Sequence, residues 1–293
     1  MCSSDLGQVD VALVVGVEKF SDQVGAPVEE ALASSTDSDF ESIQGMTPTA
    51  QAALLMQRYL HEFHAPRQAF AGFALTAHAN GAGNPYAMYR KAISAEAYNR
   101  AGYVSEPLNM FDVAPNADGA AALLLTRPEM LPPSFPRPLV RIAWSSLATD
   151  TLALHDRPDP LAFHAVRVSV ERACRQAKIT PLQVDLFELF DAYSIYAALS
   201  LEAAGFAARG EGWKLAQDGS LDRTGSLPIA TMGGLKARGN PGGATGVYQV
   251  VDSVLQLRGE AGANQIPNAR RALAQSLGGP ASTVATHVLE SVN

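Results

Sequence analysis

The sequence predicts an α/β protein in which helices cover both faces of the sheets. Short apolar runs rich in β-branched residues, typical of buried strands, alternate with longer stretches whose apolar residues recur at helical spacing. A proline-rich stretch, LPPSFPRP at 131–138, divides the chain into two parts that repeat this alternation. The 293 residues, 47% of them hydrophobic, suffice for one large domain or two halves of ordinary size with ample core.

The first half begins with a predicted buried strand, VDVALVVGVEKF at 9–20, whose β-branched run ends at Gly16. Residues 21–100 differ, because short polar stretches surround one amphipathic helix at 48–64 and a turn signal, GAGNPY, at 81–86. Such a segment is expected to lie over the sheet as an excursion rather than to form part of it. An apolar strand, ADGAAALLLT at 117–126, then returns the chain to the sheet.

The second half repeats the strand and helix alternation after the proline-rich link. Its predicted elements are strands at 139–147, 184–191, 227–234 and 283–290, and helices at 163–177, 193–205 and 247–257. Gly205 is expected to cap the second of these helices. Two successive β/α halves predict sheets with helices on both faces.

Charge, hydropathy and cysteine content exclude several classes of protein. A net charge of −7 argues against a surface for nucleic acid. No apolar run reaches the roughly 18 to 20 residues that a membrane span needs. Cys2 and Cys174 have no paired spacing, which excludes a CxxC zinc site, and without a secretory signal we expect a cytoplasmic protein that binds no metal. Cys174, on a predicted helix, is interpreted as a packing residue.

The clearest candidate for a functional site is the stretch GGLKARGNPGGATG at 233–246. It contains six glycines and leads into an apolar helix. Backbone N–H groups in such a loop can face a ligand, and the start of a helix favours an anion. A plain turn before a helix is the simpler alternative.

Seven stretches, in order along the chain, resemble the thiolase superfamily, in particular its SCP2-type and archaeal-type acyl-CoA thiolases. They are GQVDVALVVGVEKFSD, MTPTAQAALLMQRYLHEF, AHANGAGNPYAMYRK, VSEPLNMFDVAPNADGAAALLLT, FELFDAY, GFAARGEGWKLAQDG and GGLKARGNPGGATGVYQ. The resemblance implies a layered αβαβα fold of two similar halves, here 1–130 and 138–293. It also implies that the excursion at about 21–100 covers bound coenzyme A and that the protein forms a homodimer.

The resemblance further implies that the first half is incomplete. In the family, a nucleophilic cysteine opens a helix of about four turns that runs into the strand matched here by VDVALVVG. Cys2 precedes Asp10 by too few residues for that helix, which rises only about 1.5 Å per residue. We therefore reject the CSS triplet at Cys2 as the nucleophile and interpret MCSSDL as a truncated or foreign start.

Three positions depart from the family pattern. Asn240 stands where a histidine normally follows the glycine, and its amide can donate a hydrogen bond but has no proton to exchange near pH 7. Phe190, in FELFDAY, replaces a histidine or asparagine. Ser276 is the nearest match to an acid/base cysteine that thiolases carry in a loop, and its hydroxyl is a far weaker base than a thiolate. Losing one general acid or base costs roughly 10²- to 10⁴-fold in rate, so little thiolase turnover is expected.

The remaining candidates each have two interpretations. Asp191 agrees with the family pattern and could be a buried base with a raised pKa, although capping the next helix is the simpler role. His78 could contact the substrate or a dimer partner, or be a core or surface residue. Arg238 could meet a coenzyme A phosphate or be a solvated loop charge. Backbone N–H groups for the thioester are expected at Gly239, Gly243, Gly278 and Gly279.

The function that the resemblance implies is thiolase-like acyl transfer on acyl-CoA thioesters, with a diverged acid/base set. Coenzyme A would then be a substrate or product, not a permanently bound cofactor. Two alternatives are retro-aldol cleavage of a CoA-linked side chain and a non-catalytic scaffold that binds CoA esters or lipids. The resemblance also raises a possible partner, the small zinc-containing OB-fold protein that accompanies such thiolases.

Overall fold

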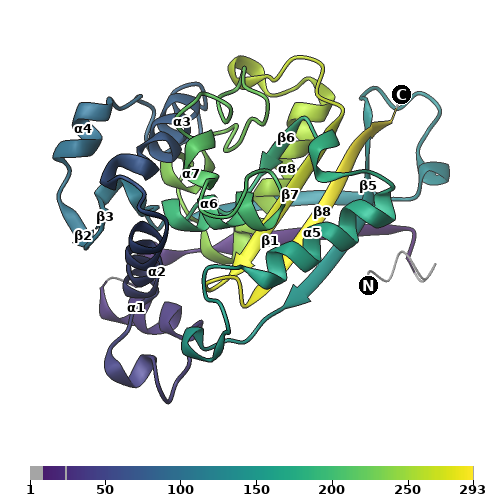
Figure 1. Cartoon of the computed structure of the whole chain (residues 1–293). Helices are drawn as coiled ribbons and strands as arrows, with labels where there is room; N and C mark the ends of the chain where they lie inside the picture. Colours follow the sequence, from purple (N-terminus) through teal and green to yellow (C-terminus); the bar gives the residue numbers. More distant parts are fainter. Residues whose placement is uncertain (1–8, 24, 293) are drawn as a thin grey trace.

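The larger of the sheets belongs to the second half of the chain. The computed structural model describes residues 9–23 and 25–292 (Figure 1). The strand order is β5–β8–β7–β6, formed by β5 (Leu139–Thr149), β6 (Leu186–Glu188), β7 (Arg271–Gly278) and β8 (Thr283–Val292). β8 pairs antiparallel with β5 and β7, and β6 runs parallel to β7. The parallel pair requires a long crossover, and the chain between these two strands holds the candidate site.

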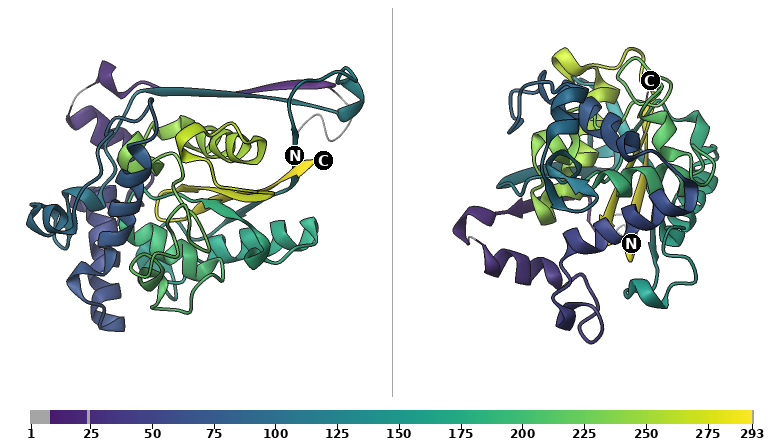
Figure 2. Two further views of the ribbon diagram at one scale, coloured as in Figure 1. Left: turned by 90° about the horizontal axis from the view of Figure 1, so that it is seen from above. Right: turned by 60° about the vertical axis from the view of Figure 1, so that its left-hand side comes forward.

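The first half contributes a long two-stranded ribbon. β1 (Val11–Glu18) pairs antiparallel with β4 (Gly119–Thr126). Helix α8 (Thr245–Arg258) contacts both this ribbon and the larger sheet, and α5 (His164–Ala177) covers the other face of that sheet, as Figure 2 shows from above. The α/β class is therefore confirmed, with the β, α, β and α layers of the arrangement that the resemblance implies.

The outer face of the β1–β4 ribbon is apolar and exposed. Leu13 and Leu124, which pair across the ribbon, are each 66% exposed. Gly16 lies on the inner face, where an added Cβ would come 2.8 Å from Ala244 Cα, so the ribbon approaches α8 closely. The expectation of a buried strand is thus wrong for the outer face, because no described element covers it.

The excursion at 21–100 gathers at one end of the molecule. It holds α1 (Ala26–Ala33), α2 (Pro48–Phe63), α3 (Ala71–Gly81) and α4 (Ala95–Arg100), followed by the small hairpin of β2 (Tyr103–Ser105) and β3 (Leu108–Asn109). Helix α2 matches its predicted range and begins after Thr47, whose side chain accepts a hydrogen bond from the N–H of Ala50. Its buried residues join the core of the second half, so the excursion is packed rather than loose.

The other helices of the second half are α6 (Ser194–Ala203) and α7 (Gly212–Leu215). The C-cap of α6 is Ala204, and Gly205 follows it with φ +87°, as the predicted glycine cap requires. Cys174 lies in α5 within the main core, where burial raises the pKa of its thiol to about 11, which confirms the packing role.

Two predicted features of the second half are wrong. Residues 227–234 form no strand and make only one bridge, from Ile229 to Phe187. Ser276, expected in a loop, lies on β7. None of the helices within 9–23 and 25–292 combines the length and apolar character that crossing a membrane requires.

Candidate functional site

The glycine loop, residues 233–246, follows the segment that bridges to β6 at Ile229 and leads into α8. Residues Gly234–Arg238 form one wide π-helical turn, and Gly242–Ala244 form a short 3-10 turn before α8. Between them, Asn240 has a fixed backbone: its N–H donates to Pro115 O at 2.8 Å, and its carbonyl accepts from Ala117 N at 3.0 Å. The loop is therefore tied to the segment that leads into β4.

The side chain of Asn240 is held by its oxygen. Oδ1 accepts hydrogen bonds from Gly242 N at 3.3 Å and from Thr245 Oγ1 at 3.1 Å. Because both donors bond this atom, it must be the amide oxygen, and the nitrogen Nδ2 points away from them. Within the described residues, Nδ2 has no hydrogen-bond acceptor. The residue is half-buried, so this N–H₂ group can donate to an oxygen that arrives from solvent.

Buried side-chain amides fix the irregular segment before the loop. Asn80 donates to Ala230 O at 3.0 Å, Asn84 to Met232 O at 2.8 Å, and Asn264 to Thr231 O at 2.8 Å. Buried backbone groups outside regular structure need such partners. These bonds explain why the segment is ordered although it is not the strand that its apolar residues predict.

Asp191 holds the loop rather than the next helix. Its Oδ1 accepts from Leu235 N at 2.7 Å. The expectation that it caps α6 is wrong, because the N-cap residue is Tyr193 and no side chain bonds the helix start. Burial raises the pKa of Asp191, and the cations of Lys236 and Arg238 oppose that rise. The predicted direction of the shift is therefore confirmed, and the use of Asp191 as a base stays a prediction.

Arg238 is buried, contrary to the interpretation as a solvated loop charge. Its guanidinium pairs with Asp252 of α8 and lies 4.4 Å above the ring of Tyr248. The side chains of both partners are less than one-tenth exposed. A contact with a coenzyme A phosphate would need an accessible guanidinium, so the structure does not place Arg238 where that prediction requires it.

Glu188 adds a second carboxylate to this buried charge cluster. Burial and the neighbouring Asp252 raise its pKa to about 7, against hydrogen bonds from Thr231 and the charge of Arg238. The folded protein thus holds this proton more tightly than the unfolded chain. The stability that Glu188 contributes is fully present below the usual pKa of a glutamate and is lost as the pH rises through about 7.

We therefore expect Glu188→Gln to flatten the dependence of stability on pH. From pH 4.5 to 7.5 the native protein should lose about 3 kcal/mol of unfolding free energy through this group, and the variant should not. Urea unfolding at several pH values measures the difference. Burial raises the pKa of Asp252 as well, and Asp252 interacts with Glu188, so the comparison measures what Glu188 adds together with its effect on the titration of Asp252. Equal slopes in the two proteins would contradict the prediction.

Ser276 lies beside the first turn of α8. A Cβ built on Gly246 would come 3.5 Å from Ser276 Oγ, so the fold brings the hydroxyl near the turn that holds Asn240. Gly278 ends β7, and an added Cβ on Gly279 would come 3.0 Å from Ser35 O. Their role as thioester donors stays a prediction. Phe190 packs against the apolar cluster of Ala114, Ala192 and Leu235, as an apolar side chain at this position would.

His78 belongs to the interior. It is 4% exposed, stacks on Tyr89 with ring centroids 5.7 Å apart, and meets Phe111 edge-on. Burial lowers its pKa. A direct contact with substrate is not supported, because these rings cover the imidazole.

Two of the predicted glycine donors are already engaged or covered. Gly243 donates its N–H to Glu18 Oε2 at 3.1 Å. Gly239 donates its N–H to Leu235 O at 3.1 Å. Glu18 is not among the site residues that the sequence predicts. It lies 225 positions before Gly243, and nothing in the local pattern at the end of β1 indicates this contact.

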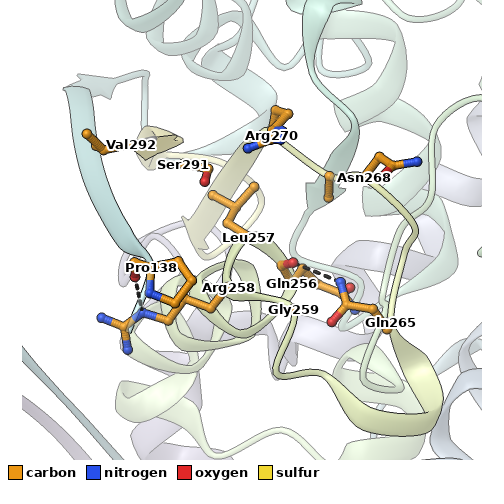
Figure 3. Close-up of a pocket in the computed structure, with 11 residues that line it drawn as sticks. Pro138, Gln256, Leu257, Arg258, Gly259, Gln265, Asn268, Arg270, Ser291 and Val292 are labelled. Carbon is orange, nitrogen blue, oxygen red and sulfur yellow. Dashed lines mark hydrogen bonds between the residues drawn. The ribbon is translucent and has the colours of Figure 1, made fainter. Parts of the chain in front are cut away.

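The hollow drawn in Figure 3 lies at the other end of α8. Its lining residues are Pro138, Gln256, Leu257, Arg258, Gly259, Gln265, Asn268, Ala269, Arg270, Ser291 and Val292. From the first turn of α8 to Arg258 the helix rises about 20 Å. This hollow is therefore separate from the Asn240 loop. Among the residues that the structure describes, no group of His, Cys, Asp and Glu side chains is arranged to hold a metal ion. Cys2, the other cysteine, lies outside the described residues.

Comparison with known proteins defines the family. Residues 3–129 match the thiolase N-terminal domain, and residues 146–291 match the thiolase C-terminal domain-like family. An acetyl-CoA acetyltransferase from Methanothermobacter thermautotrophicus is 36% identical over 282 residues, which cover 96% of this chain and 73% of that relative. The chain belongs to the thiolase family, as the resemblance of its motifs predicts.

Solved structures agree on the fold. The Ltp2-ChsH2(DUF35) aldolase has a TM-score of 0.86 at 22% identity, over 98% of this chain and 74% of that chain. The Acat5 thiolase from Ascaris suum, in complex with coenzyme A, has a TM-score of 0.64 at 13% identity, over 99% of this chain and 74% of that chain. At these identities the likeness concerns the fold.

Proposed function

We propose that this protein binds a CoA thioester with its carbonyl oxygen at Asn240 and makes or breaks a carbon–carbon bond next to that carbonyl, as a thiolase-like acyltransferase. The orientation of Asn240 carries the proposal: Oδ1 is held by two donors, and Nδ2 is free to donate. A donor in this place stabilises the negative charge that develops on the thioester oxygen when an enolate forms. Family membership and the acetyltransferase relative support the substrate class.

Retro-aldol cleavage of a CoA-linked side chain is the second candidate. Thiolytic cleavage needs a thiolate as nucleophile, whereas a retro-aldol step needs only a base for the hydroxyl and a donor for the enolate oxygen. Within the described residues the one cysteine is Cys174, which is buried in the main core. The described residues therefore offer the donor that both reactions need, but no accessible thiol to serve as the nucleophile of thiolysis.

Free coenzyme A would be a substrate or product of acyl transfer only, because in retro-aldol cleavage it stays esterified in both the substrate and the acyl-CoA product. One structure with the same fold contains coenzyme A, and another is named with a DUF35 component. A small partner of that kind, with the predicted OB fold and zinc, would bind beside this chain. A homodimer and a cytoplasmic location are further parts of the proposal that await a test.

The test is an assay of the complete protein with two kinds of substrate, next to an Asn240→His variant. Thiolysis of acetoacetyl-CoA and of a longer 3-ketoacyl-CoA would support acyl transfer, and histidine should raise that rate by about 10²-fold or more. Cleavage of a 3-hydroxyacyl-CoA with a tertiary hydroxyl, without added CoA, would support the aldolase instead. Binding of both thioesters with turnover of neither would contradict both reactions and leave the scaffold.

A further inference from the structure

The glycine turn before α8 carries an anion that belongs to the protein itself. Glu18 Oε2 accepts the N–H of Gly243 at 3.1 Å. At Gly242, where φ is +42°, an added Cβ would come 2.6 Å from the same oxygen, so the turn encloses the carboxylate closely. N–H groups at a helix start favour negative charge, and Glu18 supplies it.

The ribbon places this carboxylate. Glu18 ends β1 opposite Gly119, and the segment after it is tied to β4 because Ser21 N donates to Asp118 Oδ1 at 2.9 Å. The ammonium group of the adjacent Lys19 bonds Ser21 and Asp22 instead of Glu18. Within the described residues, the Glu18 carboxylate accepts hydrogen bonds only from backbone N–H groups, those of Gly243 and of Lys19.

The same turn also holds Asn240. Gly242 donates its N–H to Asn240 Oδ1, and the next N–H, that of Gly243, goes to Glu18. A change in the turn would move both bonds together. We propose that Glu18 is a positioning residue: its carboxylate, not a substrate phosphate, occupies the anion site of the turn and holds Asn240 with Nδ2 free. The effect on turnover rests on the proposed function, whereas the effect on the turn does not.

The experiment compares Glu18→Ala and Glu18→Gln with Glu129→Gln, a control just beyond the end of β4, at the opposite end of the ribbon from Glu18. Hydrogen exchange of the peptide that covers residues 242–245 is measured by mass spectrometry, together with kcat and KM. Glu18→Ala should exchange at least about 10-fold faster there, and α5 should be unchanged. Its kcat should fall about 10- to 100-fold, with little change in KM. Glu18→Gln keeps an acceptor for Gly243 but loses the charge, so its exchange and kcat should lie between those of the native protein and Glu18→Ala.

Each outcome decides the proposal. If the 242–245 peptide of Glu18→Ala exchanges as slowly as that of the native protein, the positioning role is overturned, whether or not the protein shows turnover. Equal loss of kcat in Glu18→Ala and Glu18→Gln, with exchange unchanged in the latter, would make Glu18 a proton-transfer group and overturn the positioning role. If Glu18→Ala does not fold, Glu18→Asp takes its place with the same expectations, because its carboxylate is one methylene too short for Gly243. Lack of turnover in the native protein with fast exchange in Glu18→Ala would refute only the proposed function.

Discussion

Asn240→Ala is expected to lower kcat by about 10²- to 10³-fold, the usual effect of removing one oxyanion donor. KM should change much less, because the bond from Nδ2 strengthens as charge develops on the thioester oxygen. Steady-state kinetics on whichever thioester the complete protein turns over measures both constants. If instead KM rises while kcat stays unchanged, Asn240 stabilises the bound substrate and the transition state equally.

Two further variants separate the donor from the fold of the loop. Asn240→Asp keeps the size and the acceptor oxygen for Gly242 but replaces the donor by a negative charge, so its kcat should fall at least as far as that of the alanine variant. Thr245→Val removes one of the two bonds to Oδ1 and should cost only a few-fold in kcat. A full-activity Asn240→Asp protein would show that no oxyanion is bound at this position.

Much of the fold could be predicted from local pattern. Helix α2 has proline at its first position and apolar residues at helical spacing, and the predicted range 48–64 differs from Pro48–Phe63 by one residue. Strand β8 likewise begins at Thr283 as predicted. These elements bury one face, so the sequence repeats with the period of the backbone.

The segment 227–234 shows where local pattern fails. Its apolar residues resemble a short strand, yet its carbonyls bond the amides of Asn80, Asn84 and Asn264. Those partners lie about 150 positions before the segment or about 30 after it, so no window of sequence contains the interaction. The backbone satisfies its polar groups with side chains, and the strand does not form.

The residues of the candidate site likewise fall into those that the sequence could predict and those that it could not. The glycines, the family motif and Asn240 could be found from sequence because they are adjacent in the chain. The roles of Asp191, Arg238 and Glu18 could not, because each depends on a partner that only the fold brings near: Leu235 N, the Asp252 carboxylate and Gly243 N. For a charged residue near a loop, sequence alone does not distinguish a solvated charge from a buried pair.

Arg238→Met is expected to destabilise the protein by about 3–5 kcal/mol, the usual cost of removing one member of a buried ion pair. The Asp252 carboxylate would remain buried without its cation, and Glu188 would lose the charge that now opposes the rise in its pKa. Urea unfolding at pH 7.5 measures the loss. Arg100→Met is the matched control, because its pair with Glu96 is more than 70% exposed and worth about 0.5 kcal/mol or less.

The same variant should show a diagnostic dependence on pH. As the pH falls, the buried carboxylates take up protons, because burial already raises the pKa of Asp252 and the loss of Arg238 raises it further. The cost of Arg238→Met should therefore shrink as the pH falls. Adding Asp252→Leu should recover most of the stability at pH 7.5, because a buried pair replaced by apolar side chains is often neutral. A loss that stays constant with pH and persists in the double variant would mean that packing over Tyr248, rather than charge, is what Arg238 supplies.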